Sequence, residues 1–172
     1  MGRLFSSLWA SILPILLVSC AGYQLGGPKP TALAEVSAIH VAMAENNTQI
    51  PRAAATVTNH VVDALIREGT YQIADGDSAD AVLKVAFHTV EFDAIRTARE
   101  NRLRPEEMEM TVELRWEIVS AANPLAKLDA GTSKGRTNLF VDPNLQAARQ
   151  SALSDALQRA STSLAARLAN GF

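Results

Sequence analysis

The chain has 172 residues, with 16 Lys or Arg against 18 Asp or Glu, which gives a formal net charge of −2. The chain therefore lacks the excess of positive charge that would indicate a nucleic-acid partner. Its content of 48% apolar and 20% charged residues is typical of a globular chain rather than a disordered one. The single cysteine cannot form an intramolecular disulfide, and it excludes zinc sites that need two or more cysteines.

The N-terminal segment 4–18 carries no charge and follows Arg3. It is shorter than the about 20 residues that a membrane-spanning helix needs, and Pro14 argues against an unbroken helix. A basic residue followed by a short apolar run is typical of a secretory signal peptide, and a buried core helix is the alternative. We therefore predict a signal peptide over residues 1–19. Its removal leaves 153 residues with a formal net charge of −3, the size of one domain.

The apolar run ends at Leu17-Val18-Ser19-Cys20, which resembles the lipobox of bacterial lipoproteins. The resemblance implies that Cys20 takes a diacylglyceryl group, that the peptide is cut before it, and that the new amino group is acylated. Each buried CH₂ contributes about 0.8 kcal/mol, so three acyl chains hold far more firmly than one. Residue 21 is Ala and not Asp. By resemblance to the sorting of bacterial lipoproteins, this implies a location in the outer membrane rather than retention in the inner one. The alternative is a free thiol after a signal peptide.

The segment 20–34 is rich in Gly and Pro and is predicted to be a lipidated tether, which leaves 35–172 as a single domain. Residues 36–43 have β-strand character and end at the turn-forming Asn46-Asn47-Thr48. Residues 51–68 repeat apolar side chains at three- and four-residue spacing, which predicts a helix that starts near Pro51 and ends at Gly69.

Four further strands are expected after this helix. They cover 70–74, 79–93, 108–118 and 128–141, and the last is expected to be broken at Gly131 and Gly135. In the third, Met108, Met110, Val112, Leu114, Trp116 and Ile118 alternate with polar residues, which indicates a sheet that is buried on one face and pairs antiparallel.

A final helix is predicted from Asp142-Pro143, an N-cap and a first helical residue, to about Asn170. Its stripe of alanines should let it pack close to its support. The element order predicts an α+β two-layer sandwich, in which two helices cover one face of a mainly antiparallel sheet of four to five strands.

The sequence offers no constellation for catalysis. His40, His60 and His88 lie on separate elements without metal-ligand spacing, and no nucleophile elbow, P-loop or dinucleotide-binding glycine pattern is present. We expect no enzyme activity, no cofactor and no metal site.

Two basic features could bind an anion. The segment 94–105 has a local net charge of +3 and contains Arg96, Arg99, Arg102 and Arg104, whose planar guanidinium groups suit phosphate. The alternative is a solvated hairpin tip balanced by Glu106 and Glu107. The polar face of the sheet, with Lys84, His88, Arg115, Lys127, Lys134 and Arg136, is the second feature, and the alternative there is also simple solvation.

The start of the predicted mature chain, Cys20-Ala21-Gly22-Tyr23-Gln24-Leu25, resembles that of the LPS-assembly lipoproteins (LptE-type). The Asn-Asn-Thr turn, the Pro51-Arg52 helix start, the segment 71–73, Ala79-Asp80 and the order of elements are also similar to that family.

This resemblance implies a non-enzymatic outer-membrane lipoprotein that faces the periplasm. Members of the family act as a plug inside the β-barrel translocon subunit LptD, help it assemble, and bind lipopolysaccharide through basic residues. By this resemblance, Arg96, Arg99, Arg102 and Arg104 are the first candidates for binding the lipid, and Lys134 and Arg136 are the second. The alternative is a lipoprotein that scaffolds other envelope or secretion machinery.

Overall fold

A computed structural model describes residues 29–97, 105–141 and 144–171. Cys20, Arg99, Arg102 and Arg104 lie outside the described residues. The elements are, in chain order, the 3₁₀ turn η2 (Thr31–Leu33), β1 (Ala38–Val41), β2 (Glu45–Asn46), α2 (Ala53–Glu68), β3 (Gln72–Ile73), the 3₁₀ turn η3 (Gly76–Ser78), β4 (Ala81–Thr97), β5 (Pro105–Ser120), β6 (Lys127–Phe140) and α3 (Leu145–Asn170).

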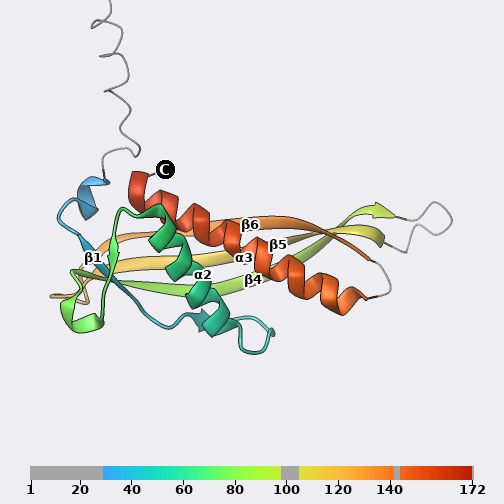
Figure 1. Cartoon of the computed structure of the whole chain (residues 1–172), viewed down its shortest axis with the longest axis horizontal. Coiled ribbons are helices and arrows are strands. Elements are labelled where there is room, and N and C mark those ends of the chain that lie inside the picture. Colours follow the sequence, from blue (N-terminus) through green and yellow to red (C-terminus); the bar gives the residue numbers. More distant parts are fainter. Residues whose placement is uncertain (1–28, 98–104, 142–143, 172) are drawn as a thin grey trace, which may run out of the picture.

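One sheet with the strand order β3-β1-β4-β5-β6 forms one layer, and β2 pairs with β4 beyond the end of β1. Both helices lie over the same face of this sheet (Figure 1). The predicted α+β sandwich is therefore confirmed. The sheet is mixed because α2 connects β1 to β3 as a crossover, which makes these two strands parallel, whereas β4, β5 and β6 form an antiparallel meander.

The alternation predicted for β5 is confirmed. Met110, Val112, Leu114, Trp116 and Ile118 are buried against the helices, and the residues between them face the opposite side of the sheet. We call that opposite side the open face.

The strand β6 runs unbroken through both of its glycines, so the expected interruption at Gly131 and Gly135 is wrong. A side chain at Gly131 would meet the ring of Trp116, and one at Gly135 would meet α3, which comes very close to the strand there. A Cβ atom on Gly135 would collide with the backbone oxygen of Ala156 and lie 2.6 Å from the backbone nitrogen of Ala160. The predicted close packing of the alanine stripe is thus confirmed, and its partner is glycine in β6.

The helix α3 begins later than expected. Its N-cap is Asn144, whose side-chain oxygen accepts a hydrogen bond from the backbone N–H of Ala147 at 3.3 Å, rather than Asp142. In the other helix, α2, Gly69 takes the expected C-cap role with a left-handed φ of 82°. Within the described ranges, neither helix is long and apolar enough to cross a bilayer.

The last residues of the predicted tether pack against the domain. Leu33 is completely buried, and Lys29 Nζ donates a hydrogen bond to the carbonyl of Val36 at 2.8 Å. Pro30 lies beside Gly171, because a Cβ atom on that glycine would be 3.4 Å from its ring. The start of the described chain therefore lies at the C-terminal end of α3, whereas β4 ends and β5 begins at the opposite end of the sheet (Figure 1).

Candidate functional site

The open face of the sheet carries a row of glutamates along its central strand, flanked by basic side chains on both neighbours. Side chains alternate along a strand, so the odd-numbered positions of β5 place Glu107, Glu109, Glu113 and Glu117 on this face. The registers of β4 and β6 then bring a Lys or Arg directly opposite Glu107, Glu113 and Glu117, whereas Glu109 reaches Arg136 at a diagonal position. We call this arrangement the charge ladder.

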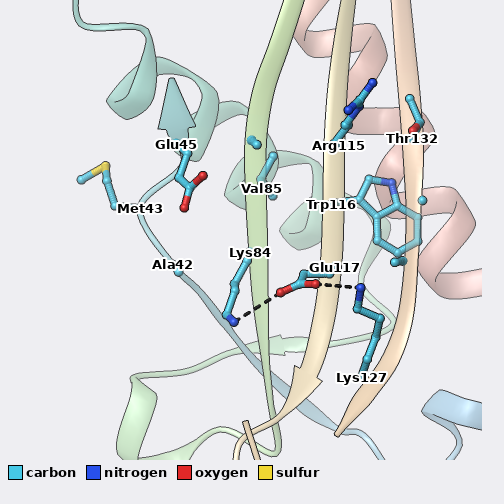
Figure 2. Close-up of a pocket in the computed structure, with 13 residues that line it drawn as sticks. Ala42, Met43, Glu45, Lys84, Val85, Arg115, Trp116, Glu117, Lys127 and Thr132 are labelled. Atoms are coloured by element: carbon cyan, nitrogen blue, oxygen red, sulfur yellow. Dashed lines mark hydrogen bonds and ion pairs between the residues drawn. The ribbon is translucent and has the colours of Figure 1, made fainter. Parts of the chain in front are cut away.

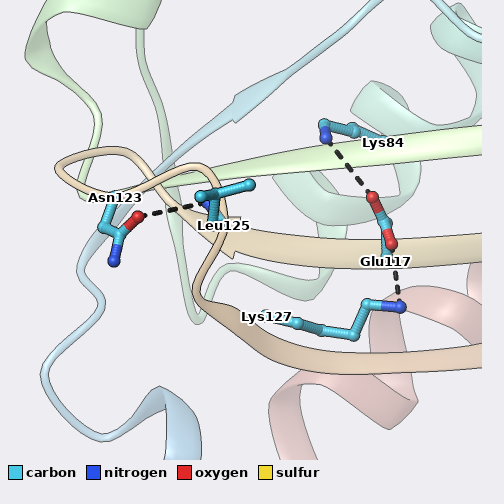
Figure 3. Close-up of polar contacts among 5 residues, drawn as sticks. All are labelled: Lys84, Glu117, Asn123, Leu125 and Lys127. Atoms are coloured by element: carbon cyan, nitrogen blue, oxygen red, sulfur yellow. Dashed lines mark hydrogen bonds and ion pairs between the residues drawn. The ribbon is translucent and has the colours of Figure 1, made fainter.

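Glu117 forms the end of the ladder near the β5–β6 turn. Its two carboxylate oxygens contact Lys84 Nζ at 3.3 Å and Lys127 Nζ at 2.9 Å, which links all three strands (Figures 2 and 3). The hydrogen bonds from Lys127 and Lys84 hold the pKa of Glu117 below its ordinary value. At neutral pH this end of the ladder is therefore ionised and paired.

Glu113 occupies the middle of the ladder. It accepts contacts from Lys134 Nζ at 3.1 Å and from Arg115 Nε at 3.2 Å. The hydrogen bond from Lys134 is the main cause that lowers the pKa of Glu113. Lys134 is thus already neutralised by a carboxylate in the free protein.

The far end of the ladder lies toward the β4–β5 connection. There Arg96 Nη2 is 3.0 Å from Glu107 Oε2, and the guanidinium lies 6.0 Å from the centre of the Phe140 ring. Arg136 Nη1 is 4.0 Å from Glu109 Oε1. Arg136 therefore has the longest ion pair of the ladder.

The structure brings three of the predicted lipid-binding residues, Arg96, Lys134 and Arg136, onto one face. Sequence reasoning missed that each of them is paired with a glutamate of β5. The alternation of residues 109–117 places the glutamates of this segment on the polar face of the strand. Their basic partners depend on the register between strands, which the sequence alone does not give.

A shallow hollow of about 620 Å³ lies on the open face beside Glu117. Its lining includes the small side chains of Ala42, Ala86 and Ala130. The charged side chains of Lys84, Arg115 and Lys127 also line it (Figure 2). Next to it, Met43 is 68% exposed. The lining of the hollow combines charges of both signs with apolar side chains such as Val85 and Trp116.

Two of the three histidines lie within hydrogen-bond distance of neighbouring elements. The ring nitrogen Nδ1 of His40 is 3.2 Å from the carbonyl oxygen of Ala74, and Nε2 of His60 is 3.4 Å from Ser154 Oγ. In the part of the chain that the structure describes, no group of three or more His, Cys, Asp or Glu side chains could hold a metal ion.

A family model described as LptE, Lipopolysaccharide-assembly, matches residues 36–170. A comparison with curated proteins finds no match. Among solved structures, the chain is similar to a minor lipoprotein from Acinetobacter baumannii, with 12% identity over 77% of this chain and 90% of that one and a TM-score of 0.55. It is also similar to an uncharacterized lipoprotein B from Nitrosomonas europaea, with 14% identity over 86% and 90% and a TM-score of 0.53. At these identities, the two likenesses concern the fold alone.

Proposed function

Because the chain belongs to the LptE lipopolysaccharide-assembly family, whose members are non-enzymatic assembly lipoproteins, we propose that it is the plug subunit of an outer-membrane lipopolysaccharide translocon. In this proposal, acyl chains on Cys20 hold it in the outer membrane, facing the periplasm. It assists assembly of an LptD-type barrel and binds lipopolysaccharide on its way to the outer leaflet. The observation that carries the proposal is the family match, which spans nearly all of the described domain.

The elongated shape of the molecule supports this role. The strand β4 has 17 residues, which corresponds to about 55 Å at the rise of an extended chain. The described chain begins at Lys29, nine residues after Cys20, beside one end of the sheet, and β4 ends at Thr97 at the other end (Figure 1). A protein of this length can extend from the membrane surface into a barrel.

The charge ladder defines how a lipid phosphate would be bound. A phosphate that reaches Lys134 or Arg136 competes with Glu113 or Glu109 for the basic group. Exposed ion pairs of this kind contribute only about 0–1 kcal/mol, so replacing a carboxylate by a phosphate costs little. The pairs hold the basic side chains extended over the open face until an anion competes for them.

The direct test is purification of the full chain from membranes in mild detergent, with identification of what accompanies it. We expect a barrel of translocon size in stoichiometric amount, and depletion of the protein should remove lipopolysaccharide from the cell surface. Recovery of secretion or motility components, with surface lipopolysaccharide unchanged, would instead support the alternative of a scaffold for other envelope machinery.

Binding of the lipid is tested by charge reversal in the arginine-rich segment. Arg99→Glu together with Arg102→Glu should weaken binding of lipopolysaccharide in a manner that depends on salt. The matched control is Arg52→Glu with Arg67→Glu, which changes the net charge equally at exposed positions at the ends of α2. Equal affinity of the first variant and the unmodified protein would contradict the assignment.

A further inference from the structure

The strand β4 has an open edge over the half that leads to the β4–β5 connection. β1 pairs with residues 81–83 of β4 and β2 with Ala86 and Phe87, but beyond Phe87 every pairing of β4 in the described residues is with β5. One side of this half therefore presents backbone N–H and C=O groups that no described strand covers. Such an edge can accept another strand. We call residues 88–95 the β4 edge.

A groove runs beside the β4 edge on the side of the helices. Its volume is about 880 Å³, and it is bounded by the edge itself, by the residues that lead into α2, and by the first turns of α3. Val90 and Phe92 point into it from the edge, because they pair with the helix-facing Val112 and Met110, and Ile50 and Leu153 line it opposite. The guanidinium of Arg149 covers the Phe92 ring at 5.2 Å. The groove can therefore receive apolar side chains from a strand added at the edge.

The other side of the β4 edge is acidic. Glu91 and Asp93 point to the open face, both are exposed, and neither has an ion pair within the described ranges. Asp93 also lies directly opposite Glu109 on β5. Like charges at directly opposite positions are destabilising, so a cation on the free side of Asp93 would be favourable.

The outer edge of β6 is not an equivalent attachment point. There α3 lies against the strand so closely that a Cβ atom on Gly135 would collide with its backbone, and Thr137 Oγ1 donates a hydrogen bond to Asp155 Oδ2 of the helix at 2.6 Å. A strand added at β6 would have little space for its side chains on the helix side. The β4 edge combines an uncovered backbone with an adjacent groove.

We propose that the β4 edge binds an extended segment of a partner protein as an added β-strand. Backbone hydrogen bonds provide the attachment, and the alternation of side chains provides the selectivity. Every second residue of the partner segment is apolar and enters the groove, and the residues between are Lys or Arg and lie beside Glu91 and Asp93. The added strand would lie on the side of β4 away from β5, next to the charge ladder at Asp93 and Glu109, and its attachment does not depend on lipopolysaccharide binding.

The experiment uses the full chain in mild detergent and a labelled, end-capped nonapeptide of alternating valine and lysine. Fluorescence anisotropy should show saturable binding, and hydrogen exchange should show slower exchange of amides between residues 88 and 95. The control peptide carries proline at two central valines, which keeps the charge but removes backbone donors. Equal binding of the control peptide, or protection located on β6 instead, would overturn the proposal.

Charge reversal tests the selectivity. The variant Glu91→Lys with Asp93→Lys should weaken binding about tenfold, as expected when two cross-strand pairs change from attraction to repulsion. The matched control is Asp63→Lys with Asp77→Lys, which changes the net charge equally at exposed positions on α2 and η3. Equal loss of affinity in both variants would show that the peptide senses only the overall charge, and the proposal would fail.

A lipid acyl chain is the other conceivable occupant of the groove. A dansylated fatty acid is the probe, because its emission rises in an apolar site. If this probe binds, Leu153→Glu abolishes its binding, and the peptide does not compete with it, the groove belongs to an acyl chain and the proposed strand addition is wrong. Displacement of the probe by the peptide would support the proposal.

Discussion

Gly135 has no space for a side chain, because the backbone of α3 lies where its Cβ atom would be. The obstacle is the main chain at Ala156 and Ala160, which cannot move without displacing the helix. We therefore predict that Gly135→Ala lowers the free energy of unfolding by about 3 kcal/mol, the upper end of the range for overpacking. Urea unfolding followed by tryptophan fluorescence measures this loss.

Gly131 and Thr132 provide the comparison for this substitution. A Cβ atom on Gly131 would lie 2.7 Å from the Trp116 ring, a side chain that can shift, so Gly131→Ala should cost less than Gly135→Ala. Thr132→Ala, at an exposed position of the same strand, should change the free energy of unfolding little. If Gly135→Ala were as stable as Thr132→Ala, the close approach of helix and strand would be refuted.

Tyr71 joins the start of β3 to the end of α3 through a buried hydrogen bond. Its hydroxyl donates to the carbonyl oxygen of Leu168 at 2.7 Å, and burial, together with the charge of Glu68, raises the pKa of Tyr71 from 10.0 to about 12. The fold therefore favours the neutral phenol. The stability from this group is complete below pH 10 and is lost as the pH rises through about 12.

Replacement of Tyr71 by phenylalanine tests this linkage. Tyr71→Phe should lower the free energy of unfolding by about 1 kcal/mol at pH 8, because the Leu168 carbonyl loses its donor. The difference from the unmodified protein should become smaller at pH 11, because the variant has no phenol to ionise. Urea unfolding at both pH values measures it, and a difference that grows with pH would contradict the assigned cause.

At the scale of elements, the charge ladder makes a prediction about β5. Glu113→Gln removes the carboxylate that neutralises Lys134 and Arg115. Because exposed pairs contribute about 0–1 kcal/mol, the fold should be little affected. Binding of lipopolysaccharide should become tighter by about threefold, since the phosphate no longer has to compete with a carboxylate.

The control for this change is Asp63→Asn, an exposed position on α2 with the same change in charge. It should leave the affinity for lipopolysaccharide nearly unchanged. Weaker binding by Glu113→Gln would show instead that Glu113 positions Lys134 for the lipid. Titration of fluorescent lipopolysaccharide at two salt concentrations separates these outcomes.

The alternation of residues 108–118 was enough to predict which face of β5 is buried, because side-chain parity is a local property of a strand. The pairing of Lys134 with Glu113 was not predictable, since it depends on the register between β5 and β6. The role of the glycines of β6 was not predictable for a similar reason: Gly135 faces the backbone of α3 and Gly131 faces Trp116 of β5, and neither neighbour is close in the sequence. The bulge at His88, which moves Val90 and Phe92 to the helix side, also has no local signal of this kind.

At the scale of the whole molecule, the two ends of the sheet have different predicted environments. The end near Pro30 and Gly171 follows the predicted lipid anchor, and the other end leads into the arginine-rich connection. The outer-membrane location of the whole arrangement depends on the predicted acylation of Cys20 and on the residue that follows it.

Substitutions at these two positions should therefore separate anchoring from sorting. Cys20→Ser should release the protein from membranes, because a serine hydroxyl cannot form the thioether to the lipid. Ala21→Asp should keep the protein acylated but retain it in the inner membrane, where its barrel partner is absent. Sucrose-gradient fractionation and the intact mass of the mature chain measure both effects. A Cys20→Ser protein that still fractionates with the outer membrane would show that contacts of the folded domain, and not the acyl chains, hold it there.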